Sequence, residues 1–264
     1  MRLNRVLCLG LTAGWAAMAS GAEPLPVASA APALSGSLFV HCAAGIKDPV
    51  AEIAKKFEAE TGVKVEIAYA NSGQLLGQIE TTHVGDVYVP GDVSFADKAV
   101  EKKLAVGAPR PFSWFVPGIY VRKGNPKGIR VLADLARPGV GLALADDSAA
   151  IGKLQSDLFR KNGIDAQALK RNVKVSPAMV TDVALAVKMG TVDAGLIWSA
   201  LGSLYPEDAE IVLIPKAQNV VGAVAACTLA GSKNPKAAAA FLDYLVSDKG
   251  RAVLTAKGYA VDPP

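Results

Sequence analysis

The hydrophobic and polar positions of this chain follow two different periods, and the change of period predicts where strands give way to helices. In the stretch VKVEIAYANSGQLLGQI (63–79), every second residue from 63 to 67 is apolar, which is typical of a strand. Leu75, Leu76 and Ile79 then fall at helical spacing. The turn between them carries Asn71 and Ser72, which are both good N-cap residues. We therefore expect a helix to begin at about residue 72.

The start of this helix could bind an anion. The first turn of a helix presents free N–H groups and the positive end of the helix dipole. With the hydroxyl of Ser72 beside them, these groups could hold an anion without any positively charged side chain. The alternative interpretation is a capped helix that binds nothing.

Similar alternation continues to the end of the chain and predicts an α/β fold. Four expected helix starts, near Gly45, Ser72, Ser148 and Val180, follow strands, as the ligand-facing turns of open α/β sheets do. Two long apolar strands, 115–122 and 222–229, bracket the middle of the chain and predict two crossings between two lobes. The expected lobes comprise residues 37–118 with 225–264, and residues 119–224. The expected strands are 38–42, 63–69, 86–89, 115–122, 141–145, 172–175, 195–198, 210–214 and 222–229, and the expected helices are 49–60, 72 onwards, 95–103, 131–136, 149–161, 180–189, 236–246 and 249–257.

The N-terminus has the pattern of a cleavable signal peptide. Arg2 and Arg5 precede an apolar run, 6–18, that is too short to span a bilayer, and small residues end at Ala22. We expect residues 1–22 to be removed and residues 23–36, rich in Ala, Pro and Ser, to form a disordered leader. The mature protein is then periplasmic.

Charge and cysteine content narrow the class of partner. Losing Arg2 and Arg5 lowers the formal net charge from +4 to +2, and the remaining basic residues are scattered, which argues against nucleic acid or an anionic membrane surface. Cys42 and Cys227 lie in apolar stretches. Export permits a disulfide between them, and two buried free thiols are the alternative.

Metal binding and catalysis have little support in the sequence. His41 and Cys42 are adjacent strand residues that point to opposite faces, and no spacing typical of a metal site is present, so we expect no direct cation ligands. An exported enzyme with Ser72 or Cys42 as nucleophile would need His41 or His83 as its base. Asp146 and Asp147 are expected to cap the next helix, and Asp86 and Asp92 to stabilise turns.

Several segments together resemble the molybdate-binding subfamily of extracellular solute-binding proteins, the capture components of ATP-driven (ABC) importers. The matching segments are HCAAGI (41–46) with its ExxxxFExETG helix, YANSGQLLGQIE and GDVYVPGD (69–92), VRKGNP (121–126), LADLARPGVGLAL (132–144), DAGLIW (193–198), and the C-terminal run from 232 to 259. The resemblance covers residues 38–259. It implies a two-lobed (type II) periplasmic-binding-protein fold, in which each lobe is a mixed sheet flanked by helices.

The resemblance also implies a tetrahedral oxyanion, molybdate or tungstate first, held between the lobes by neutral donors and delivered to a membrane permease by a monomeric protein without a cofactor. Sulfate, a small organic anion, or a role as a sensor subunit stay open as alternatives. One serine of the family falls on Ser72, beside Asn71, and the other at about Gly45, where only an N–H remains. The tyrosine of the family falls on Trp198, whose indole donates but does not accept. The implied ligand-binding residues are Gly45, Asn71, Ser72, Ser148, Ile151, Val180 and Trp198.

Overall fold

The computed structural model describes residues 34–263, which form two five-stranded sheets flanked by helices. The predicted signal peptide, 1–22, and most of the predicted leader lie outside these residues. Within residues 34–263, no helix has both the length and the apolar character that a bilayer crossing requires.

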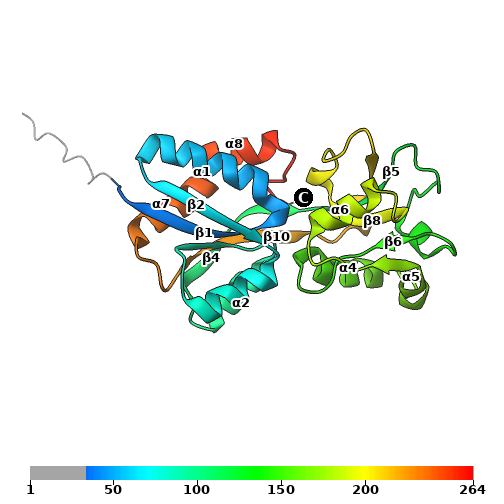
Figure 1. The fold of residues 1–264 in the computed structure, drawn as a ribbon, viewed down its shortest axis with the longest axis horizontal. Coiled ribbons are helices and arrows are strands. Elements are labelled where there is room, and N and C mark those ends of the chain that lie inside the picture. The colour runs from blue at the N-terminus through cyan, green and yellow to red at the C-terminus, as the bar shows by residue number, and fades with distance from the viewer. Residues whose placement is uncertain (1–33, 264) are drawn as a thin grey trace, which may run out of the picture. The chain divides into compact units, whose positions relative to one another are not determined.

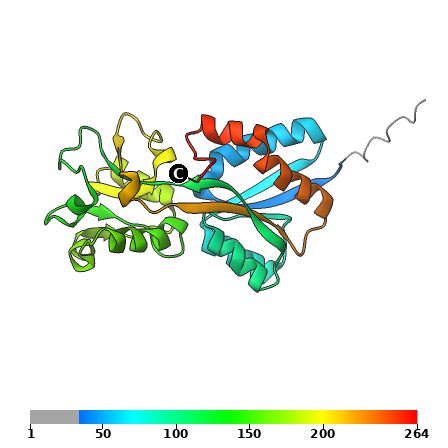
Figure 2. The ribbon, with the colours of Figure 1, turned by 180° about the vertical axis from the view of Figure 1, so that it is seen from behind.

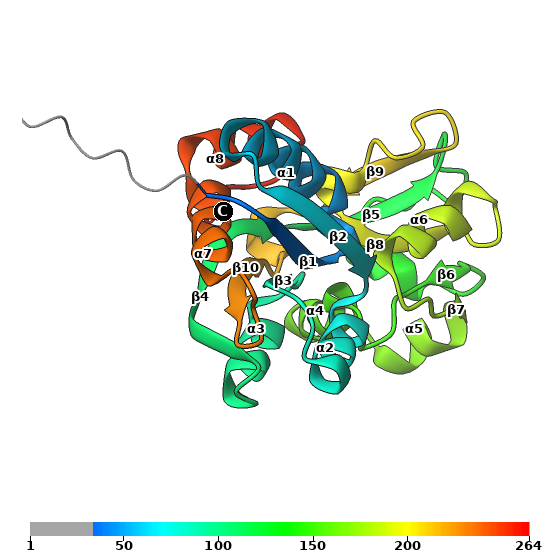
Figure 3. The same cartoon turned by 60° about the vertical axis from the view of Figure 1, so that its left-hand side comes forward.

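The first sheet has the strand order β2-β1-β3-β10-β4. Its β1 is parallel to β2 and β3, whereas β10 is antiparallel to both β3 and β4. Figure 2 shows the molecule from behind, with β10 in orange. Helices α1, α7 and α8 lie on one face of this sheet, and α2 and α3 lie on the other (Figures 1 and 3). The bounds are β1 Ser37–Ala43, β2 Lys64–Ala70, β3 Val87–Val89, β4 Ala105–Phe115, β10 Gly222–Leu229, η1 Ala44–Ile46, α1 Lys47–Thr61, α2 Ser72–Thr82, α3 Val93–Glu101, α7 Pro235–Val246 and α8 Asp248–Ala256.

The second sheet has the strand order β7-β6-β8-β5-β9. Its β6 is parallel to β7 and β8, and β5 is antiparallel to β8 and β9. Helix α6 packs on β8, β5 and β6. The bounds are β5 Pro117–Arg122, β6 Leu142–Ala143, β7 Val173–Val175, β8 Ala194–Trp198, β9 Ala209–Leu213, α4 Ala150–Lys161, α5 Ala166–Asn172, α6 Val180–Lys188, η2 Leu132–Ala136, η3 Ser199–Leu201 and η4 Lys216–Gln218.

The chain passes between the sheets at two places, which are the stretch between β4 and β5 and the stretch between β9 and β10. Sequence periodicity predicted one strand at 115–122, but the structure contains two, separated at Val116. Strand β4 begins at Ala105, ten residues earlier than expected. The sequence pattern missed this part of the strand because Gly107, Pro109 and Pro111 are typical of a loop. An edge strand tolerates such residues, and β10 is the only strand of this sheet that pairs with β4 among residues 34–263, with irregular register.

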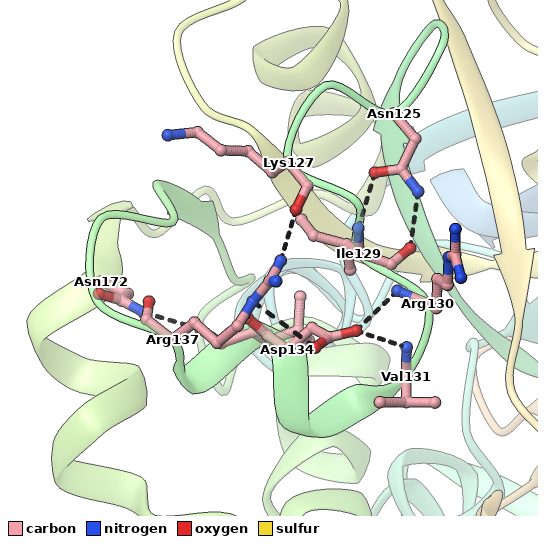
Figure 4. Close-up of polar contacts among 9 residues, drawn as sticks. Asn125, Lys127, Ile129, Arg130, Val131, Asp134, Arg137 and Asn172 are labelled. Carbon is pink, nitrogen blue, oxygen red and sulfur yellow. Dashed lines mark hydrogen bonds and ion pairs between the residues drawn. The ribbon is translucent and has the colours of Figure 1, made fainter.

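The loop from β5 to η2 is fixed by side chains that replace regular secondary structure (Figure 4). The Asn125 side chain accepts from the Ile129 N–H at 2.9 Å and donates to the Ile129 carbonyl at 2.8 Å. Asp134 accepts from the N–H groups of Arg130 and Val131 at 2.8 and 3.0 Å. These local bonds give the loop a defined path where the hydrophobic pattern breaks.

Asp86 and Asp92, which flank β3, were both expected to stabilise turns; Asp86 does so, whereas Asp92 caps a helix. The buried Asp86 carboxylate accepts from the N–H of Phe39 at 2.8 Å and from the hydroxyl of Ser232 at 2.6 Å, which ties β1 to the turn before α7. Asp92 caps α3 by accepting from the N–H of Ser94 at 2.9 Å.

Cys42 and Cys227 are both buried free thiols in the described part of the chain, which decides between the two alternatives left open by the sequence. Burial raises the pKa of the Cys227 thiol to about 12, so it stays protonated. Both side chains therefore act as small apolar core residues.

His41 is buried in β1, and its Nε2 lies 2.8 Å from the Val84 carbonyl, so Nε2 carries the proton in the neutral ring. Its Nδ1 is buried and has no hydrogen-bond partner among residues 34–263. A second proton on Nδ1 would have no acceptor. Burial therefore lowers the pKa of His41 below 6.5, and the hydrogen bond to the Val84 carbonyl opposes this shift.

This burial predicts a pH dependence of stability. The unfolded chain binds a proton at His41 near pH 6.5, whereas the native state binds it only at lower pH. The free energy of unfolding should therefore be flat above this value and fall as the pH drops below it. Denaturant titrations of wild type and His41→Gln between about pH 8 and pH 5 would test this, because glutamine can keep the bond to Val84 without titrating. An equal pH dependence in both proteins would contradict the assignment.

Candidate functional site

A small cavity lies where the starts of several helices meet, and residues associated with both sheets line it. The cavity is small, with a volume of about 20 Å³. Its lining residues are Ala43, Ala44, Gly45, Asn71, Ser72, Gly91, Phe115, Ala149, Ala150, Ile151, Met179, Val180 and Trp198.

The structure brings together six of the seven implied ligand-binding residues around this cavity: Gly45, Asn71, Ser72, Ile151, Val180 and Trp198. The seventh, Ser148, is not among the lining residues. Its hydroxyl and its N–H both bond to the Asp146 carboxylate, and its carbonyl accepts from the N–H of Gly73 at 3.1 Å. Ser148 thus connects the start of α2 to the segment before α4.

The sequence allowed both Asn71 and Ser72 to cap α2 and to bind an anion, and the structure separates these two roles. Asn71 is the N-cap of α2, and its Oδ1 accepts from the N–H of Gln74 at 2.8 Å. Its Nδ2 is buried and has no partner among the described residues. A buried donor without a partner costs about 1–3 kcal/mol, and an acceptor in the cavity would remove that cost.

Ser72 is the first helical residue, and its Oγ accepts from the N–H of Gly91 at 3.0 Å. The Ser72 hydroxyl proton finds no acceptor within residues 34–263, so it is free to donate into the cavity. The Ser72 carbonyl accepts from the Tyr88 hydroxyl at 2.6 Å. His41 bonds to Val84 instead of Ser72, so the structure does not form the serine–histidine pair that a nucleophile would require.

Two of the helices that begin at the cavity, α4 and α6, lack side-chain caps, whereas α2 is capped by Asn71. The N-cap residues of α4 and α6 are Ala149 and Met179, and neither makes a side-chain capping bond. By contrast, α3, α5, α7 and α8 are capped by Asp92, Asp165, Asn234 and Ser247. The expectation that Asp146 or Asp147 caps α4 is wrong, because α4 begins after Ala149 and Asp146 instead bonds to Ser148.

The uncapped helix starts leave backbone donors available. In the described part of the chain, no acceptor is present for the N–H groups of Ile151 in α4 or Val180 in α6. Both residues line the cavity, and the dipoles of the two helices make this region electropositive. No ionisable side chain is among the lining residues. The site therefore offers neutral donors to an anion.

Trp198 and Gly45 fit together at one wall. The Trp198 indole is only 2% exposed and stacks on Phe115 with 4.3 Å between ring centroids. A Cβ atom on residue 45 would lie 2.6 Å from the Trp198 Nε1, which is closer than atoms can approach. Gly45 is therefore required by the position of the indole.

Sequence reasoning missed several lining residues, of which Gly91 is the most informative. A Cβ atom at position 91 would lie 3.0 Å from both the Ala150 Cβ and the Phe115 ring. The VPGD segment (89–92) contained this glycine, but only the structure shows that it allows the close approach of α4. Ala43, Ala44, Phe115, Ala149, Ala150 and Met179 carry no polar side chain that could have marked them.

Comparison with known proteins identifies the family to which the chain belongs. The family model described as "Bacterial extracellular solute-binding protein" matches residues 38–260. The molybdate-binding protein ModA of Mycobacterium tuberculosis is 29% identical over 225 residues, which are 85% of this chain and 84% of that protein.

Solved structures share the fold at lower identity. The periplasmic molybdate-binding protein of Azotobacter vinelandii superposes with a TM-score of 0.68 at 19% identity, covering 86% of this chain and 100% of that chain. The sulfate-binding protein SubI of Mycobacterium tuberculosis superposes with a TM-score of 0.77 at 20% identity, covering 86% and 88%. The two flanked sheets confirm the two-lobed periplasmic-binding-protein fold implied by the sequence. The chain belongs to the family of bacterial extracellular solute-binding proteins.

Proposed function

We propose that the cavity captures one small, fully deprotonated tetrahedral oxyanion, with molybdate or tungstate as the first candidates. The observation that carries this proposal is the convergence of unused donors on one cavity without an ionisable side chain. These donors are the Asn71 Nδ2, the Ser72 hydroxyl, the uncapped starts of α4 and α6, and the Trp198 indole N–H. An anion that carries no proton needs only donors.

The acceptors around the cavity are already occupied, which supports the same class of ligand. The Asn71 Oδ1 and the Ser72 Oγ accept from Gln74 and Gly91, and the Ser148 carbonyl accepts from Gly73. Each of these oxygens already accepts one hydrogen bond, so a ligand that must donate would have to share an acceptor. A protonated anion or a sugar hydroxyl would therefore leave one of its own donors poorly paired.

The relatives support transport as the biological setting. ModA of Mycobacterium tuberculosis is named as a molybdate-binding protein, and it aligns over most of this chain. We infer that the mature protein is a monomer that acts in the periplasm after removal of residues 1–22 and delivers its ligand to an ABC permease. The lobe boundaries 37–118, 119–224 and 225–264 belong to this proposal. Because SubI is a sulfate-binding protein, sulfate is the second candidate ligand.

Isothermal titration calorimetry with a panel of anions tests the proposal. At about pH 8, molybdate, tungstate or sulfate should bind one per chain, and hydrogen phosphate should bind at least about a hundredfold more weakly, because its proton meets only donors. Neither heat nor a thermal shift with any of these anions would refute the oxyanion assignment. Equal affinity for phosphate would show that an acceptor lines the occupied site.

A further inference from the structure

The carbonyl of Gly45 lacks the donor that a regular helix would supply. Gly45 lies in η1, the 3-10 turn that leads directly into α1, and if the α-helical pattern extended back to it, its carbonyl would accept from the N–H of residue 49. Residue 49 is Pro49, near the start of α1, and proline has no N–H. The Tyr259 hydroxyl occupies this position and donates to the Gly45 carbonyl at 2.7 Å.

Tyr259 lies outside the cavity lining, in the segment that follows α8, 214 residues along the chain from Gly45. It is 5% exposed, and its ring lies beside Phe115 with 6.0 Å between centroids. Phe115 in turn stacks on Trp198, so the three aromatic side chains follow one another beside Gly45. Burial raises the pKa of Tyr259, so its hydroxyl remains a donor at any physiological pH.

We propose that Tyr259 is a positioning residue of the oxyanion site, which keeps the Gly45 carbonyl engaged and thereby leaves the Trp198 indole N–H free for the ligand. This inference rests on the proposed function. The Trp198 Nε1 lies against Gly45, 2.6 Å from where a Cβ would be, so the indole N–H is a donor directly beside the residue whose carbonyl would be released. A bond between them would withdraw one donor from the cavity. It would also place the negative end of a carbonyl beside the anion.

Tyr259→Phe removes the hydroxyl and keeps the ring. In this variant, we expect oxyanion affinity to fall about tenfold, which is the effect of losing one hydrogen bond to a charged ligand. In the ligand-free variant, the indole ¹H–¹⁵N signal of Trp198, assigned with Trp198→Phe, should move downfield as the indole bonds to the carbonyl. Tyr244→Phe is the matched control, since it removes a tyrosine hydroxyl that bonds to Glu60 at 2.8 Å, away from the cavity.

The double variant Pro49→Ala/Tyr259→Phe provides the decisive comparison. Alanine at position 49 restores an N–H that can bond to the Gly45 carbonyl, so both the affinity and the indole signal should return towards wild type. A merely structural role for Tyr259 would lower stability without moving the indole signal, and Pro49→Ala would not restore binding.

The outcomes separate this inference from the proposed function. If wild type binds oxyanions and Tyr259→Phe binds equally well with an unchanged indole signal, the positioning role is wrong while the function stands. If wild type binds no oxyanion, the proposed function fails. The indole signal of the ligand-free variants then still tests whether Tyr259 keeps the Gly45 carbonyl away from the Trp198 indole. An unmoved signal in Tyr259→Phe would contradict this positioning role as well.

Discussion

Ser72→Asp should abolish oxyanion binding and at the same time stabilise the ligand-free protein. The new carboxylate would lie at the start of α2, beside the unpartnered Asn71 Nδ2 and the cavity donors. It can accept from these groups and from the N–H of Gly91, so it acts as an internal anion. The favourable dipole and hydrogen bonds should raise the free energy of unfolding by about 1 kcal/mol.

The same carboxylate would repel a bound oxyanion. Two unit charges about 4 Å apart at an effective dielectric constant of about 20 repel by about 4 kcal/mol, and a dianion such as molybdate is repelled more strongly, so the loss of affinity should be at least roughly a thousandfold. Calorimetry with molybdate and chemical denaturation without ligand measure the two effects. Ser72→Asn is the matched control, because it has nearly the shape of aspartate and no charge. It should lose less affinity than Ser72→Asp and gain no stability.

The milder variant Ser72→Ala should weaken both oxyanion binding and the stability of the ligand-free protein. Affinity should weaken by roughly ten- to a hundredfold, because a hydrogen bond to a charged group is lost. Capping is not affected, since Asn71 is the cap. The buried N–H of Gly91 loses its acceptor, however, and the ligand-free protein should lose about 1–3 kcal/mol of stability. If the Ser72→Asp variant binds molybdate as tightly as wild type does, Ser72 does not contact the anion.

Gly45→Ser should impair both folding and binding, although it adds a hydroxyl donor to the cavity wall. The new Cβ would lie 2.6 Å from the Trp198 Nε1 and 2.9 Å from its Cδ1. The indole cannot easily move aside, because it is 2% exposed and stacked on Phe115. Overpacking of this kind costs about 1–3 kcal/mol. Displacement of the indole should also remove its N–H from the ligand, so we expect affinity to fall by about tenfold or more.

A matched glycine and a second-site change make this prediction specific. Gly77 lies in α2, and a Cβ atom added at this position would meet no other atom within 4 Å, so Gly77→Ser should leave binding unchanged. In the double variant Gly45→Ser/Trp198→Leu, the smaller side chain should relieve the steric conflict. The stability effects should then be non-additive by about 0.5–3 kcal/mol. Additive effects in this double-mutant cycle would contradict the contact between Gly45 and Trp198.

Local sequence pattern predicted much of the secondary structure because its causes are local. The alternation from 63 to 67 and the spacing of Leu75, Leu76 and Ile79 correspond to β2 and α2. Strand β4 and helix α5 were missed for different reasons. Prolines in β4 are tolerated only because it is an edge strand, and α5 is a short segment whose hydrophobic period is weak.

The part of the candidate site that lies within a single turn could be predicted from the sequence. Asn71 and Ser72 could be named because an N-cap pair after a strand is visible in the sequence. Gly45 and Val180 were marked only as lying near expected helix starts. Ile151 and Trp198 depended on the family resemblance, since neither residue follows a pattern that indicates a ligand contact. Ser148 was named as an expected helix start, but α4 begins after Ala149, and the N–H and hydroxyl of Ser148 both bond to Asp146.

The amino-acid sequence was sufficient to establish the order of most strands and helices, the family, and the turn at which Ser72 begins α2, because periodicity and capping act between residues a few positions apart. The packed fold was needed to show which helix starts remain uncapped at the cavity and which acceptors around it are occupied. It was also needed to show that Gly45 must be glycine and that Tyr259 replaces the N–H missing at Pro49. These features depend on contacts between residues far apart in the chain, such as Gly45 with Trp198 and with Tyr259. Only packing of the two sheets and the C-terminal segment brings such residues within hydrogen-bond distance.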